Sequence, residues 1–123
     1  MLQIAICDDD KKDLEVIYDC LSNTLFDVED IQVSRYQSGK ELITHLQEDP
    51  GGCDLLLLDI GMEPVDGMQA AGYIRDNKLD LDIIFITKST EYVYQGYQYR
   101  AYAYILKEHL KENLPEVLVR YVE

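Results

Sequence analysis

Short runs of apolar residues recur along the chain, and polar residues bound each of them. Four of these runs cover residues 4–7, 55–58, 83–86 and 103–106. A short, unbroken apolar run predicts a strand that is buried on both faces of a sheet. In residues 31–36 apolar and polar side chains alternate instead. This alternation predicts a less buried strand, which we expect at an edge of the sheet.

Apolar residues at helical spacing fill the segments between these strands. The first helix should begin after Asp10, a good N-cap residue. Ser38 and Glu41 form the pattern of a capping box at the start of the second helix, and Asp66 caps the third with Gln69.

Two more helices are expected, one over about residues 90–99 and one from Leu110 onwards. Gly96 lies in the middle of the first and costs that helix ~1 kcal/mol relative to Ala, so it indicates close packing on the sheet. Pro115 should lie in the first turn of the last helix or break it, because proline lacks the N–H that an interior position needs.

Strand and helix therefore alternate five times, which predicts an α/β domain with a parallel sheet and helices on both faces. We expect one domain over residues 1–123. Placing the second strand at an edge favours the strand order 2-1-3-4-5 of doubly wound, flavodoxin-like (βα)5 folds. In this order the first and third strands end side by side, where such sheets form their binding sites.

The formal net charge of −13 argues against nucleic-acid binding by this domain, because phosphate contacts need clustered Lys and Arg. The charge suits a cation or a basic partner surface instead. The three cysteines lack metal-site spacing, so we expect free thiols and a reducing, cytoplasmic location. We expect neither a signal peptide nor a membrane span, because no apolar run has the required length.

Polar residues follow the apolar runs at the expected rim of the sheet. Asp8 and Asp9 follow the first run, and Asp59, Thr87 and Lys107 follow the other buried runs. Crowded carboxylates repel one another unless a cation lies between them, and hard oxygen ligands favour Mg²⁺, with Mn²⁺ as the alternative. The set suits phosphoryl transfer, with Asp59 as nucleophile, Lys107 as a point charge on the transferred oxygens and Thr87 as a hydroxyl donor.

The segments IAICDDD, LLLLDIGMEPVDG, IIFIT and AYAYILK resemble the receiver domain of bacterial response regulators, and the resemblance covers nearly the whole chain. The segment STEYVYQGYQYRAYAYILK is most similar to receivers attached to LytTR-type DNA-binding domains. The resemblance implies a phosphoacceptor domain of a two-component system rather than an enzyme. Asp59 would take a phosphoryl group from the phosphohistidine of a sensor histidine kinase.

The resemblance also implies roles for the other residues. Asp9 would bind Mg²⁺ directly, Asp8 would assist, and the carbonyl of Gly61 would be a further ligand. Thr87 and Tyr104 would be the switch pair, and Lys107 would bind the phosphoryl group. Phosphorylation would reorganise the fourth helix and fifth strand, where regulators commonly form homodimers. Any output domain would lie outside residues 1–123.

Three positions depart from the family pattern. Glu108 replaces the proline that usually follows the active-site lysine, so we predict a trans Lys107–Glu108 peptide bond. Lys88 replaces the small residue that usually follows the switch threonine, which affects access to the phosphoryl group. Glu63 stands where many receivers have proline.

Six of the ten tyrosines lie between residues 92 and 104. In a helix over this segment Val93, Gly96 and Tyr97 should face the sheet. Tyr92, Tyr94 and Tyr99 should then form an exposed face for a partner, because aromatic side chains are low-entropy anchors for an interface. Core packing of the tyrosines is the alternative.

Two other functions stay open at this stage. Asp8 and Asp10 form an Asp-x-Asp pattern after the first strand, which a haloacid-dehalogenase-like phosphohydrolase uses, although Lys12 departs from that motif. A receiver-like domain that only binds protein, without phosphorylation, is the other alternative.

Overall fold

A computed structural model describes residues 1–123 and contains one sheet of five parallel strands. The strands are β1 (Leu2–Cys7), β2 (Ile31–Tyr36), β3 (Leu55–Leu58), β4 (Asp82–Thr87) and β5 (Ala103–Leu106). Their order is β2-β1-β3-β4-β5, with β2 at an edge. The predicted flavodoxin-like order 2-1-3-4-5 is therefore confirmed.

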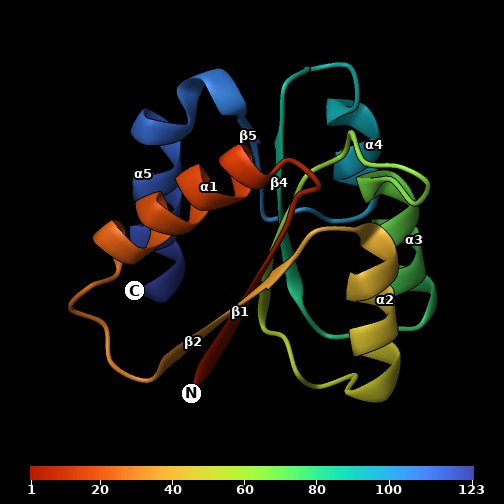
Figure 1. Ribbon diagram of the computed structural model, residues 1–123, viewed down its shortest axis with the longest axis horizontal. Helices are drawn as coiled ribbons and strands as arrows, with labels where there is room; N and C mark the ends of the chain where they lie inside the picture. Colours follow the sequence, from red (N-terminus) through yellow and green to blue (C-terminus); the bar gives the residue numbers. More distant parts are fainter.

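Helices follow the strands and cover both faces of the sheet (Figure 1). They are α1 (Lys11–Thr24), α2 (Gly39–Glu48), α3 (Gly67–Asp76), α4 (Val93–Gln98) and α5 (Leu110–Val122), with a 3-10 turn η1 (Lys107–His109) before α5. Figure 1 shows α1 and α5 together on one side of the sheet and α2, α3 and α4 on the other. The fold is the three-layer arrangement that the alternating pattern predicted.

The unbroken apolar runs exist because the sheet has a core on each face. Successive residues of a strand point to opposite faces, so Leu55 and Leu57 pack with α1 and α5, while Leu56 and Leu58 pack with α2 and α3. All four are at most 1% exposed. Each fully buried leucine contributes about 1.5–3 kcal/mol, so the run in β3 is a main source of stability.

The strands are in register at their carboxyl ends. Cys7 pairs with Leu58, and Leu58 pairs with Phe85. The Asp59 N–H donates to the Cys7 carbonyl at 3.0 Å, one residue beyond the β1–β3 ladder. The residues that follow β1 and β3 therefore lie beside one another at the rim of the sheet.

Local capping sets where three helices begin. The Asp10 side chain accepts from the backbone N–H groups of Lys12 and Asp13, as its N-cap assignment predicted. Asp66 and Gln69 form the full capping box. At α2 only the Ser38 half of the box forms, because the Glu41 carboxylate accepts from Gln37 N–H instead.

Two helix predictions were wrong in detail. Helix α4 covers only Val93–Gln98 and has no side-chain cap at its N-terminus; the preceding residues form a turn, in which the Val93 N–H donates to the Thr90 carbonyl at 3.2 Å. Pro115 lies inside α5 without breaking it, five residues beyond Leu110. The buried side chains of Leu110, Leu114 and Leu118 hold this helix on the sheet and outweigh the one hydrogen bond that Pro115 cannot make.

The helices are also too short or too polar to serve as membrane spans. The Lys107–Glu108 peptide is trans, as predicted, and the cis peptide bond of this chain is Glu63–Pro64.

Candidate functional site

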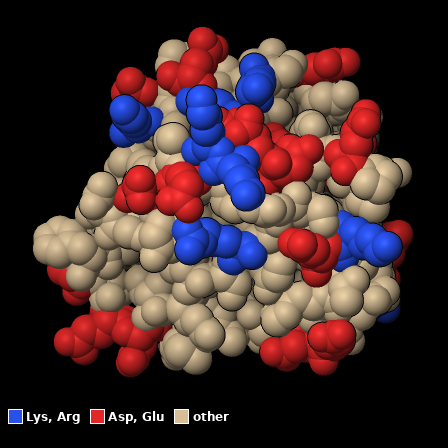
Figure 2. Space-filling model, viewed as in Figure 1, with Lys and Arg blue, Asp and Glu red and all other residues tan.

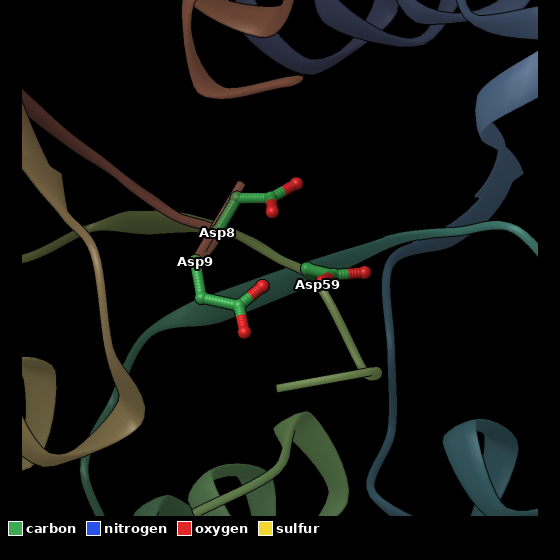
Figure 3. A group of neighbouring side chains, drawn as sticks. All are labelled: Asp8, Asp9 and Asp59. Atoms are coloured by element: carbon green, nitrogen blue, oxygen red, sulfur yellow. The ribbon is translucent and has the colours of Figure 1, made fainter. Parts of the chain in front are cut away.

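Asp8, Asp9 and Asp59 come together at the carboxyl ends of β1 and β3. One carboxylate oxygen from each residue lies within 4.8 Å of the others. Figure 3 shows the three carboxylates pointing to the same side, from two strand ends that are distant in sequence. The structure therefore brings together the acidic cluster that the strand order predicted.

The three carboxylates differ in their surroundings. Asp8 is fully buried and Asp59 is 5% exposed, whereas Asp9 is exposed. The Asp8 Oδ1 atom accepts from the Asp10 backbone N–H at 2.9 Å. Two buried acids beside an exposed one give a site that is open to solvent on one side.

Lys107, the first residue of η1 and directly after β5, is the cation of this cluster. Its Nζ lies 2.8 Å from Asp8 Oδ2, 2.8 Å from Asp13 Oδ2 and 3.4 Å from Asp59 Oδ1. The predicted convergence of Lys107 on the carboxylates is therefore present. Asp13, in the first turn of α1, was not predicted, because an acid there is ordinarily explained by the helix dipole alone.

Burial and charge act against each other in this cluster. Burial raises the pKa of Asp8 to about 6, although hydrogen bonding and the Lys107 charge oppose it. Burial also raises the pKa of Asp59, again against the pull of Lys107. Burial alone would lower the pKa of Lys107, but Asp13, Asp8 and Asp59 together raise it. Lys107 therefore stays protonated, but its single positive charge faces three carboxylates.

The donor set fits a divalent cation. Asp8 Oδ2 is buried and has no hydrogen-bond donor of good geometry, although the Lys107 ammonium lies 2.8 Å away. A single ammonium shared among several buried carboxylates leaves net negative charge in the site, and a hard divalent cation would offset that charge. All the ligand atoms offered here are oxygens, which suits Mg²⁺.

A small cavity of about 140 Å³ lies over the cluster. No hydrophobic residue lines it, and its walls are Asp9, Asp10, Asp13, Asp59, Gly61, Thr87, Lys88 and Lys107. Thr87 is 5% exposed at the end of β4, and Lys88 beside it is exposed. Gly61 and Thr87 were predicted to lie at the rim beside Asp59, and both line this cavity. Lys88 forms part of the cavity wall as well.

Tyr104 lies away from this cavity, on β5. Its hydroxyl donates to the Ser89 carbonyl at 2.7 Å, and its ring is 6.0 Å from that of Phe85. Gly96 of α4 packs closely on both rings, since a Cβ there would lie 3.1 Å from Phe85 Cδ2. The prediction that Gly96 marks close packing is confirmed.

The predicted tyrosine face forms only in part. Tyr94 is 75% exposed, but Tyr92 and Tyr99 are half-buried and pack against the core. Val93 and Tyr97, which were predicted to face the sheet, are 44% and 83% exposed. The short α4 is turned so that only Gly96 is buried, because a glycine leaves room for the close approach to Phe85. The exposed aromatic pair is therefore Tyr94 and Tyr97.

Acidic and basic side chains are mixed on the surface. Figure 2 shows acidic and basic side chains interspersed, with a red group directly beside a blue one near the top centre of the view. At the strand ends themselves, Lys88 and Lys107 are the basic residues among the acids that line the cavity.

Comparison with known proteins agrees with this geometry. The family model described as the response regulator receiver domain matches residues 4–119. The transcriptional regulatory protein NatR of Bacillus subtilis is 30% identical over 123 residues, which are all of this chain and 51% of NatR. The response regulator SaeR of Staphylococcus aureus is 31% identical over 91 residues, or 74% of this chain and 36% of SaeR. The chain thus spans about half or less of these relatives.

A solved structure supports the fold. The response regulatory domain of MrkE from Klebsiella pneumoniae superposes with a TM-score of 0.86 at 20% identity, covering 98% of this chain and 95% of that chain. These matches do not favour a phosphohydrolase or a non-phosphorylated binding module. The carboxylate cluster at the β1–β3 rim, the 2-1-3-4-5 sheet and the family match lead to one conclusion: the chain belongs to the response regulator receiver domain family of two-component systems.

Proposed function

We propose that Asp59 is the phosphoacceptor of this receiver domain and that Lys107 and Thr87 bind the transferred group. The observation that carries the proposal is the setting of Asp59. Its carboxylate is nearly buried at the central strand end, 3.4 Å from the Lys107 ammonium, and it lines the cavity together with Thr87. A nucleophile and two candidate phosphoryl-binding groups thus meet in one small polar space.

The phosphodonor would be the phosphohistidine of a sensor histidine kinase. An Asp59 carboxylate oxygen attacks phosphorus, the O–P bond forms and the P–N bond breaks, and the imidazole keeps the electron pair of that bond. The product is an acyl phosphate on Asp59. The Lys107 ammonium and the Thr87 hydroxyl then offer donors to the phosphoryl oxygens. The domain changes its own covalent state and turns over no separate substrate.

Asp8, Asp9 and Asp59 would hold Mg²⁺, or Mn²⁺ in its place, with the Gly61 carbonyl as a further ligand. When bound, the cation supplies positive charge that lets an anionic phosphodonor approach an anionic site. Asp9 is exposed and free to turn toward the cation, whereas Asp8 is fixed by its hydrogen bond from Asp10. Asp9 is therefore the direct ligand and Asp8 the supporting one.

Thr87 and Tyr104 would form the switch. If Thr87 turns toward a phosphoryl oxygen, the space that it leaves allows the β4–α4 loop and Tyr104 to move. Tyr104 is tied to this loop through the Ser89 carbonyl. Helix α4 lacks a side-chain cap at its N-terminus and buries only Gly96, so its packing opposes such a rearrangement weakly.

The partners follow from this assignment. They are a sensor histidine kinase and, through the α4–β5 face, a second copy of this chain or an output partner. NatR is described as a transcriptional regulatory protein, and we propose a role in transcription regulation here too. The closer affiliation to LytTR-type regulators stays a prediction, because neither NatR nor SaeR is described in those terms. We also propose a cytoplasmic location, because Cys7, Cys20 and Cys53 are free thiols, which suit a reducing compartment.

The direct test is intact-mass measurement after incubation with acetyl phosphate and Mg²⁺. We expect one phosphoryl increment in the wild-type domain and none in Asp59→Asn, which should still fold. An increment that persists in Asp59→Asn would move the nucleophile to Asp8 or Asp9. Turnover of a generic phosphate monoester would then support the phosphohydrolase alternative, which uses Asp8 and Asp10.

A further inference from the structure

We propose that Asp13 is the counter-ion outside the carboxylate cluster that holds Lys107 in the unphosphorylated domain, so that a phosphoryl group on Asp59 must compete with Asp13 for the ammonium. The proposal rests on the functions proposed above for Asp59 and Lys107. It assigns Asp13 a positioning role, because Asp13 acts on the reaction through Lys107.

The geometry of Lys107 favours Asp13. Both Asp13 Oδ2 and Asp8 Oδ2 lie 2.8 Å from Nζ, but only the contact with Asp13 has the geometry of a hydrogen bond. The distance to Asp59 Oδ1 is longer, at 3.4 Å. The ammonium is therefore shared between Asp8, inside the acidic cluster, and Asp13, outside it, and the contact with Asp13 has the better hydrogen-bond geometry.

The position of Asp13 is itself fixed. Its backbone N–H donates to the N-cap residue Asp10, so the first turn of α1 is held at the rim of the sheet. The side chain of Lys107 is 13% exposed and that of Asp13 28% exposed. A charge pair in a site this sheltered is screened less by solvent than a surface pair. The pair bridges the first turn of α1 and the end of β5 and keeps Lys107 from turning fully to Asp59.

This arrangement gives Lys107 two competing sets of partners. A cation among Asp8, Asp9 and Asp59 would repel the ammonium toward Asp13. A phosphoryl group on Asp59 would draw it the other way. Removing the Asp13 charge should thus have opposite effects on the binding of two ligands. Lys107 would neutralise Asp8 and Asp59 more fully, which would weaken Mg²⁺ binding. The same lysine would be freer to bind a phosphoryl mimic on Asp59, which would strengthen the binding of that mimic.

The experiment compares Asp13→Asn with wild type in two calorimetric titrations. Mg²⁺ affinity should fall by ~3–10-fold, and the affinity for trifluoroberyllate at saturating Mg²⁺ should rise by ~3–10-fold. Asp19→Asn is the matched control, since Asp19 is an exposed acid on the same helix without an ion pair. It should leave both affinities within about twofold of wild type. Asp13→Glu keeps the charge and should restore values near those of wild type.

Lys107→Met tests whether the effect passes through the lysine. In that background Asp13→Asn should change Mg²⁺ affinity no more than Asp19→Asn does. An equal fall in Mg²⁺ affinity with and without Lys107 would overturn the proposal, because Asp13 would then act only through net charge. Weaker trifluoroberyllate binding by Asp13→Asn would also overturn it, since Asp13 would then orient Lys107 rather than compete for it.

These outcomes are separate from the test of the proposed function. If wild type takes up neither acetyl phosphate nor trifluoroberyllate, the phosphoacceptor function fails. The Mg²⁺ titrations of the single and double variants would still decide whether Asp13 holds Lys107.

Discussion

Gly67, the first residue of α3, lies directly against the backbone of Asp59. A Cβ at Gly67 would overlap the Asp59 carbonyl oxygen and lie 2.7 Å from the Ile60 α carbon. The Gly67 N–H also donates to the Ile60 carbonyl at 3.0 Å. The glycine is required by this close approach and not by a positive φ, which no glycine of the chain adopts. This close contact holds the segment that carries Asp59 against the first residue of α3.

Gly67→Ala should therefore lower the unfolding free energy by ~1–3 kcal/mol, because the neighbouring atoms are backbone and cannot turn aside. It should also reduce phosphorylation by acetyl phosphate, since the backbone of Asp59 would shift. Urea unfolding and intact-mass measurement test the two effects. Gly72→Ala is the control in the same helix. Its Cβ would make only ordinary contacts, the nearest at 3.5 Å, so this variant should be neutral or more stable by up to ~1 kcal/mol.

The stability of the metal-free domain should depend on pH through Asp8. Folding raises the pKa of this buried carboxyl from 3.8 to about 6. Between these values the folded state binds a proton that the unfolded state has released, so this contribution to stability falls as pH rises through that range. Asp8→Asn should remove this loss of stability, because the asparagine side chain does not titrate. In EDTA it should stabilise the domain by ~1–3 kcal/mol near neutral pH and have little effect near about pH 4.

Urea unfolding of wild type and Asp8→Asn across this pH range measures the difference. Saturating Mg²⁺ should reduce the advantage of the variant, because a cation that binds only the folded state stabilises wild type more. A variant that is less stable than wild type at neutral pH without metal would contradict the prediction.

Metal binding should depend on Asp9 far more than on Asp10. Asp9 belongs to the carboxylate cluster, whereas the Asp10 side chain accepts two backbone N–H groups at the start of α1. Asp9→Ala should weaken Mg²⁺ binding strongly in a calorimetric titration and leave the fold intact. Asp10→Ala should mainly lower stability by removing the helix cap. Equal losses of metal affinity in both variants would mean that these roles are wrongly assigned.

Self-association through α4 should depend on Tyr94 and Tyr97, the two exposed aromatic residues of that helix. The phosphorylated domain or its trifluoroberyllate complex should associate more than the free domain, and more strongly as salt screens the charge of −13. Replacing both tyrosines by alanine should abolish the difference in sedimentation. Phe26→Ala is the control, because Phe26 is also 83% exposed but lies beyond the end of α1. Monomers at every salt concentration in both states would leave the tyrosines without this role.

The sequence alone determined the strands, their order and the identity of the central carboxylates. Unbroken apolar runs such as Leu55–Leu58 specify strands with a core on both faces, because only such a setting buries every side chain. Residues that directly follow these runs, such as Asp8 and Asp59, must then lie at one rim. Caps such as Asp10 were also predictable, since capping depends on a few neighbouring residues.

Tertiary structure decided what local pattern cannot specify. The pair of Lys107 and Asp13 joins residues 94 positions apart, and nothing in the first turn of α1 identifies that partner. The orientation of α4 was predicted wrongly at Val93 and Tyr97, because the helix is short and its rotation is set by the fit of Gly96 on Phe85 and Tyr104. Periodicity states which side chains can share a face of a helix. Which face meets the sheet depends on contacts between distant segments, and those exist only in the folded chain.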